Sequence, residues 1–145
     1  KGGDVTLVDD AYNANPESMR AAIEGFARRP GRKIVALGEM RELGEGSAAL
    51  HAGLATSILA AKVSAAVLSG GEMKHLADAL TARDQSMRVV HVTGPAEAAE
   101  QVKSWLEPGD AVLIKGSNAS GMAKVGTALR QMSEGASSSQ KASGA

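Results

Sequence analysis

The sequence predicts a doubly wound α/β domain, in which helices cover both faces of a mostly parallel sheet of about five or six strands. Two observations carry this prediction. Short aliphatic runs recur along the chain with little alternation of polar and apolar residues, as in strands that are buried on both faces of a parallel sheet. Segments with the apolar period of a helix separate these runs, and this repeated order favours βαβ units.

The elements follow in chain order. The predicted strands are residues 5–10 (VTLVDD), 33–38 (KIVALG), 65–70 (AAVLSG), 88–93 (RVVHVT) and 111–116 (AVLIKG). The predicted buried stripes of the helices are Met19, Ala22, Ile23 and Phe26; Leu50, Leu54, Ile58 and Ala61; Met73, Leu76, Ala77 and Leu80; Ala98, Val102, Trp105 and Leu106; and Met122, Val125, Leu129 and Met132. In such a Rossmann-like domain, ligands bind beyond the carboxyl ends of the strands.

The length of 145 residues fits one domain, which we expect to comprise residues 1–132. Residues 133–145 are small and polar, and they predict a disordered tail. The chain begins at Lys1 without an initiator methionine and enters a strand almost at once, so we expect a piece of a longer protein.

Composition excludes several classes of function. Lys+Arg and Asp+Glu both number 16, and no basic run occurs, so nothing favours nucleic-acid binding. The apolar runs fall far short of the roughly 20 residues that span a bilayer. The absence of cysteine rules out disulfides and thiolate metal sites and fits a reducing compartment. We therefore expect a cytoplasmic protein that binds neither nucleic acid nor membrane.

The end of the first strand, DDAYNANPESM at residues 9–19, has two interpretations. In the structural one, Asn15 caps the next helix and Pro16 takes its first position. In the functional one, a strand-end carboxylate accepts hydrogen bonds from ribose hydroxyls, and asparagine amides bind a substrate. The residues that capping leaves unexplained are Asp10, Tyr12 and Asn13.

The end of the second strand continues as LGEMRELGEGS. Gly38 permits close backbone approach, and Ser47 is expected to cap the following helix. Three carboxylates in this loop could hold a metal ion, but such spacing is more typical of a solvated face, and we predict no metal site; these are Glu39, Glu42 and Glu45. The nearby His51 is interpreted as a surface or packed residue and not as a catalyst.

The last strand ends in KGSNASG. Lys115 beside the backbone N–H groups of a helix start suits a carboxylate or a phosphate. The alternative is that Ser117, Asn118 or Ser120 only caps that helix. The chain has no GxxxxGK[ST] phosphate-binding loop and no GxGxxG after its first strand, so ordinary NAD binding is disfavoured.

Taken together, DDAYNANPESMRAAI, LGEMRELGEGSAALH and VLIKGSNASGMAKV resemble the C-terminal domain of the Mur ligases over about residues 5–132, and match best the members that add D-Ala-D-Ala. The resemblance implies a cytoplasmic parent enzyme of peptidoglycan synthesis. That enzyme uses ATP to join D-Ala-D-Ala to a UDP-linked muramoyl tripeptide through an acyl phosphate. Its C-terminal domain closes over the ATPase domain and contributes nucleotide and dipeptide contacts.

The resemblance also assigns residues. Asp10 matches the acidic nucleotide-contacting position, with Asp9 as a possible substitute, and the nucleotide set also includes Tyr12 and Asn13. The residues expected near the dipeptide are Asn13, Asn15, Lys115, Gly116 and Ser117. Asn118 stands where many relatives carry arginine, which weakens any specific role for it.

No catalytic residue is expected in this domain. The resemblance places the phosphate-binding loop and the Mg²⁺ ligands in a central ATPase domain, and UDP binding in an N-terminal domain. We therefore expect this chain to be inactive on its own.

Two other functions remain open. A receiver-type signalling domain would place paired acids, a hydroxyl and a lysine at strand ends, and Asp9, Asp10, Thr93 and Lys115 occupy those places. Against it, the third strand ends without the aspartate that accepts the phosphoryl group, and only Glu72 follows. The other alternative is an unassigned α/β module that binds a small ligand.

Overall fold

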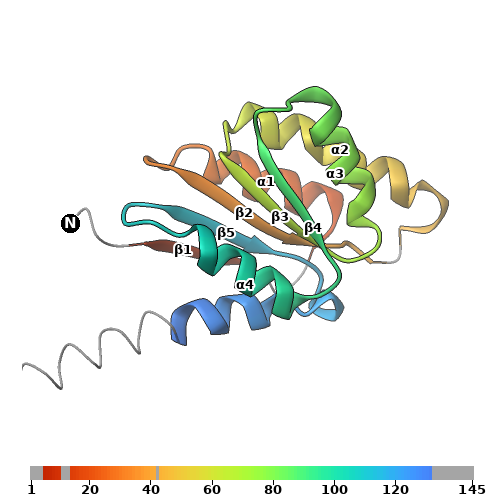
Figure 1. The fold of residues 1–145 in the computed structure, drawn as a ribbon. Coiled ribbons are helices and arrows are strands. Elements are labelled where there is room, and N and C mark those ends of the chain that lie inside the picture. Colours follow the sequence, from red (N-terminus) through yellow and green to blue (C-terminus); the bar gives the residue numbers. More distant parts are fainter. Residues whose placement is uncertain (1–4, 11–13, 42, 132–145) are drawn as a thin grey trace, which may run out of the picture.

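The computed structural model describes residues 5–10, 14–41 and 43–131, with the side chain of Asp10 left aside. Its strands are β1 (Thr6–Asp10), β2 (Lys33–Gly38), β3 (Ala65–Ser69), β4 (Arg88–Val92) and β5 (Ala111–Lys115). They form one sheet in the order β1-β5-β2-β3-β4, and every pairing is parallel (Figure 1). The five predicted strands are confirmed, with ends that differ by at most one residue.

Helices cover both faces of this sheet, as predicted (Figure 1). The helices α1 (Pro16–Phe26), α2 (Ser47–Ala60) and α3 (Met73–Arg83) share one apolar cluster with Val35 and Leu37 of β2. On the other face, α4 (Pro95–Trp105) and a helix over residues 123–131, here called the C-terminal helix, pack against Ile34 and Ala36. Because successive side chains of a strand point to opposite faces, the sheet contributes to two separate cores.

The route of the chain explains which strand ends become neighbours. From β1 to β4 the chain advances in one direction, and α1, α2 and α3 all lie on one face. After β4 it returns over the other face through α4 and inserts β5 between β1 and β2. Because crossovers keep one hand, a reversal of direction requires a change of face. The carboxyl ends of β1, β5 and β2 therefore lie side by side.

Most residues of the predicted stripes are buried, Ala22 and Leu106 are partly buried against the cores, and one residue is exposed. Leu54, Ile58 and Ala61 of α2 are buried, but Leu50 is 37% exposed, so its placement in the stripe is wrong. The reason is that His51, with no exposed surface, occupies the core-facing position of that first turn. Met132 lies outside the described residues, as does the predicted tail.

Two short 3-10 turns lie near the strand ends: η1 (Gly44–Gly46) precedes α2, and η2 (Asn118–Ser120) precedes the C-terminal helix. Within the part of the chain that the structure describes, no helix combines the length and the apolar character needed to cross a membrane.

Candidate functional site

The three segments singled out in the sequence follow three neighbouring strands, β1, β5 and β2. The register pairs Asp10 with Lys115, and Lys115 with Leu37. Tyr12 and Asn13 lie outside the described residues, as does the side chain of Asp10. The nucleotide contacts expected of these three residues therefore stay a prediction, whereas the frame around them can be described.

Asp9 has a partner within the domain. Its Oδ2 atom accepts a hydrogen bond of 2.5 Å from Nη1 of Arg130, on the C-terminal helix. The carboxylate also lies against Gly126, where an added Cβ would come within 2.2 Å of Oδ2. Asp9 thus joins β1 to the C-terminal helix, a structural role that the sequence did not reveal because its partner is 121 residues away.

Lys115 closes β5 and is only 2% exposed. It follows Leu113 on the side of the sheet that α1, α2 and α3 cover, while Ile114 between them belongs to the other core. Removing an ammonium group from water is costly without compensating negative or polar groups. The ammonium group of Lys115 is therefore expected to lie against negative or polar groups.

Gly116 and Ser117 fasten the end of β5 to the end of β2. A Cβ on Gly116 would lie 2.6 Å from Oγ of Ser120 and 3.0 Å from Cα of Gly38, so only glycine fits there. The N–H of Ser117 donates to the carbonyl of Glu39 over 3.2 Å. Its hydroxyl accepts from the N–H of Ser120 over 3.1 Å, so Ser117 caps the short η2 turn and not, as the structural alternative predicted, the helix itself.

Asn15 also caps a helix. Its Oδ1 accepts from the N–H of Ser18 over 2.8 Å, and the N–H of Asn15 donates to Oγ of Ser18 over 3.0 Å. Pro16 takes the first position of α1. This reciprocal pair confirms the structural interpretation of Asn15. A further contact between Asn15 and a substrate stays a prediction.

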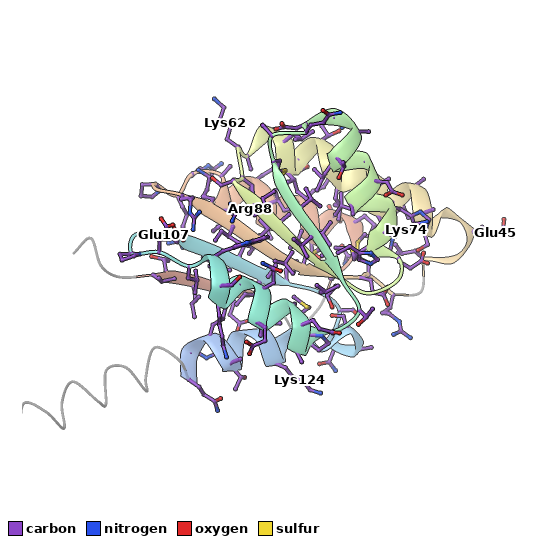
Figure 2. All side chains as sticks on the ribbon, in the orientation of Figure 1. Glu45, Lys62, Lys74, Arg88, Glu107 and Lys124 are labelled. Carbon is purple, nitrogen blue, oxygen red and sulfur yellow. The ribbon has the colours of Figure 1, made fainter. Side chains whose placement is uncertain are left out.

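The carboxylates after β2 differ in their surroundings. Oε2 of Glu39 accepts from the N–H of Glu72 over 2.8 Å, at the start of α3, and the side chain lies against Gly70. Figure 2 shows Glu45 at the tip of the η1 turn, pointing away from the body of the domain. Glu42 lies outside the described residues. Within those residues, no group of three side chains suited to metal binding occurs.

Ser47 does not cap α2, contrary to prediction. Gly46 holds the cap position, and Ser47 is the first helical residue. Its hydroxyl donates instead to Oε1 of Glu72 over 2.5 Å, because the close end of β3 offers a carboxylate. This hydrogen bond is the main cause that lowers the pKa of Glu72, against a smaller opposing effect of burial.

His51 is packed and not catalytic, in agreement with the sequence interpretation. Its Nε2 accepts from the N–H of Met40 over 3.0 Å. Nδ1 lies 2.7 Å from the carbonyl of Ser47, an acceptor, so Nδ1 carries the proton. The neutral imidazole therefore bridges the end of β2 and the first turn of α2.

The receiver-type interpretation is wrong. In such a domain the hydroxyl after the fourth strand must lie close to the paired acids. Here β4 and β1 form opposite edges of the sheet, four strand spacings or about 19 Å apart. Thr93, which follows β4, donates its hydroxyl to Oε2 of Glu97 on α4 over 2.8 Å.

A groove of about 460 Å³ lies elsewhere, between α4 and the C-terminal helix. Pro95, Ala99 and Ala128 form part of its apolar lining, and Lys103 and Lys124 stand among its polar residues. Figure 2 shows Lys124 on the C-terminal helix, on the outer surface of that layer. None of the residues that line this groove belongs to the strand ends of β1, β5 or β2. This groove is therefore separate from the candidate site at the strand ends.

Comparisons with known proteins agree with the geometry. The family model described as "Mur ligase, glutamate ligase domain" matches residues 1–118. The UDP-N-acetylmuramoyl-tripeptide–D-alanyl-D-alanine ligase of Mycobacterium tuberculosis (strain ATCC 25618 / H37Rv) is 35% identical, over 89% of this chain and 29% of that protein. The protein of the same name from Escherichia coli (strain K12) is 31% identical, over 86% of this chain and 27% of that protein.

Among solved structures, the MurF ligase from Thermotoga maritima in complex with ADP superposes with a TM-score of 0.73 at 28% sequence identity. The match covers 90% of this chain and 29% of the Thermotoga chain. The chain thus spans less than a third of the length of these relatives.

Proposed function

The chain belongs to the Mur ligase family, and from this premise we propose that it is the C-terminal domain of an ATP-dependent ligase that adds D-alanyl-D-alanine to UDP-N-acetylmuramoyl-tripeptide. The names of the curated relatives support both substrates. The ADP in the complex of the Thermotoga relative supports the use of ATP.

One observation carries the proposal. The three segments that resemble the family lie far apart in sequence, yet they follow the adjacent strands β1, β5 and β2. Insertion of β5 brings Lys115 into register with Asp10 on one side and next to the end of β2 on the other. Ligands of doubly wound domains bind at such strand ends.

In the proposed reaction, ATP phosphorylates the terminal carboxylate of the tripeptide. The amine of the dipeptide then attacks the acyl carbon, so that a C–N bond forms, the C–O bond to phosphate breaks and the amine loses a proton. This domain supplies binding and orientation. Asp10, Tyr12 and Asn13 contact the nucleoside end of ATP, with Asp10 accepting from ribose hydroxyls.

The end of β5 receives the dipeptide. Lys115 attracts its carboxylate, and Gly116 lets the substrate approach the backbone closely. The set of residues proposed near the dipeptide is Asn13, Asn15, Lys115, Gly116 and Ser117.

Magnesium is expected with ATP, but the described residues do not fit a magnesium site. No group of three carboxylate or histidine side chains gathers within them. As the family resemblance implies, we assign the Mg²⁺ ligands and the phosphate-binding loop to the central ATPase domain of the parent enzyme. UDP recognition is assigned to its N-terminal domain. Because the reaction consumes ATP and a UDP-linked precursor, we place the parent enzyme in the cytoplasm.

The test is an assay of the full-length parent enzyme with ATP, UDP-N-acetylmuramoyl-tripeptide and D-Ala-D-Ala. We expect one phosphate released per pentapeptide formed, as measured by phosphate detection and by product mass. Phosphate release with no mass increase of the tripeptide, in the presence of the dipeptide, would contradict the proposal.

The isolated 145-residue chain is the matched control. It should release no phosphate from ATP, because its binding residues serve the nucleoside and dipeptide ends only. Sustained ATP hydrolysis by this chain alone would contradict its role as a binding domain.

A further inference from the structure

His51 lies beneath the strand-end site and takes no part in the function proposed above. The imidazole has no exposed surface, and both of its nitrogens are engaged. Nε2 accepts from the N–H of Met40 over 3.0 Å, and Nδ1 donates to the carbonyl of Ser47 over 2.7 Å. A buried side chain that satisfies two backbone groups holds both segments in one geometry.

The Met40 contact continues toward the site. Met40 follows Glu39, whose carbonyl accepts the N–H of Ser117 over 3.2 Å. Oε2 of Glu39 accepts the N–H of Glu72 over 2.8 Å, which fixes the same residue to the start of α3. Residues 39–40 therefore form hydrogen bonds with α2, with the start of α3 and with the end of β5. Of the residues that make these contacts with positions 39–40, His51 is the one with no exposed surface.

We propose that His51 is a positioning residue for the proposed ligase reaction, which holds residues 39–40 so that the end of β5, with Lys115 and Ser117, keeps its place beside the incoming dipeptide. This inference rests on the proposed function. The contact that we assign to positioning is the hydrogen bond between Nε2 and the N–H of Met40, because Met40 follows Glu39, whose carbonyl binds Ser117. The contact from Nδ1 to Ser47 lies within α2 and only orients the ring.

Two substitutions separate these contacts. Glutamine reaches as far as Nε2, so His51→Gln keeps an acceptor for the N–H of Met40. Asparagine reaches only as far as Nδ1, so His51→Asn keeps a donor for Ser47 and leaves the N–H of Met40 buried without an acceptor. Both replacements are neutral amides, so they differ mainly in reach.

In the full-length enzyme, His51→Asn should raise the KM for D-Ala-D-Ala about tenfold, with the KM for ATP within about twofold of wild type. His51→Gln should restore the dipeptide KM to within about threefold of wild type. Leu54→Ala, one turn further along α2 and equally buried, is the control for general loss of stability, and its dipeptide KM should stay at the wild-type value.

In the 145-residue chain, NMR gives a readout that does not depend on any activity. His51→Asn should shift the amide signals of Met40 and Ser117 and speed their hydrogen exchange, whereas His51→Gln should preserve both signals. If the wild-type parent enzyme showed no ligase activity, the proposed function would fail while these signals still tested the positioning role.

Two outcomes overturn the inference. In one, His51→Asn keeps the wild-type dipeptide KM and the wild-type Ser117 signal. In the other, His51→Asn, His51→Gln and Leu54→Ala all change the dipeptide KM in proportion to their loss of stability. If His51→Asn does not fold, the Gln variant decides: an unchanged Ser117 signal supports the inference, and a lost one overturns it.

Discussion

At the amino ends of the strands, Arg32 and Asp110 bind each other, whereas at the carboxyl ends the described polar contacts join strand ends and loops to neighbouring helices and to one another. Asp110 accepts from Nε of Arg32 over 3.0 Å, from its Nη2 over 2.7 Å and from the N–H of Glu107 over 2.8 Å. Arg32 also donates to the carbonyl of Trp105. The polar groups at this edge satisfy one another, and their role is to hold the fold together.

At the carboxyl ends of the strands, the polar groups are used differently. Ser117, Met40 and Glu72 all donate backbone N–H groups, and the acceptors come from other segments. These contacts hold three strand ends in place around the residues that we assign to substrates. The comparison teaches that one sheet can use polar residues at the amino ends of its strands to stabilise the fold, and at the carboxyl ends to position a binding site.

The largest effect on stability should come from a substitution at the amino ends of the strands. Asp110→Ala leaves Arg32 and the N–H of Glu107 without their acceptor, and the loss of one partner of a buried pair costs about 3–5 kcal/mol. Arg32 is 31% exposed, so water replaces part of the loss, and we expect about 2–3 kcal/mol less unfolding free energy. Urea denaturation measures it.

Asp84→Ala is the control for Asp110→Ala. Asp84 accepts from the N–H and the hydroxyl of Ser86 in a surface turn, so its removal should cost far less. Equal losses in the two variants would show that the amino edge contributes no more than an ordinary turn.

Alanine substitutions at two glycines should change stability in opposite directions and so sharpen the comparison. Gly116→Ala brings a Cβ to 3.0 Å from the backbone of Gly38, and it should cost about 1–3 kcal/mol. Gly53→Ala, in the exposed part of α2 with nothing within 4 Å of the new Cβ, should stabilise by about 0.5–1 kcal/mol. Thermal unfolding measures both, and a stabilised Gly116→Ala would mean that the two strand ends are not held tightly together.

The smallest effect that we expect is on the dependence of stability on pH in the acid range. Burial by itself raises the pKa of Asp110, but hydrogen bonds from Arg32 and Glu107 outweigh it and hold that pKa below its ordinary value. This stabilisation is therefore complete above the unfolded-state pKa of about 3.9 and is lost as pH falls through the folded-state pKa. Urea midpoints from about pH 6 to about pH 3 should fall less steeply in Asp110→Asn than in wild type. Parallel curves would refute this link.

The strands could be predicted because aliphatic runs bounded by glycine and charge have few other uses in a soluble domain. The cap at Asn15 could be predicted because it depends on Ser18, three residues away. Contacts between distant segments could not. The pairs Asp9 with Arg130 and Ser47 with Glu72 depend on which strands become neighbours, and local sequence does not encode that order.

The position of β5 between β1 and β2 is the main feature that the sequence left open. Periodicity indicates that a run is a strand, but not which partners it chooses. The resemblance to a known family identified the site segments, and only the fold explains why segments from both ends of the chain share one edge.

The central claim is that Asp10, the last residue of β1, serves a ligand, whereas Asn15 serves the fold. Its most direct test compares Asp10→Ala with Asn15→Ala in the full-length enzyme, by kinetics and thermal unfolding. Asp10→Ala should lower kcat/KM for ATP about tenfold to a hundredfold at an unchanged Tm, since a lost charge-assisted hydrogen bond costs about 1.5–3 kcal/mol. Asn15→Ala should lower stability by about 1 kcal/mol with little kinetic change. An Asp10→Ala enzyme that melts early yet keeps wild-type kinetics would contradict the account.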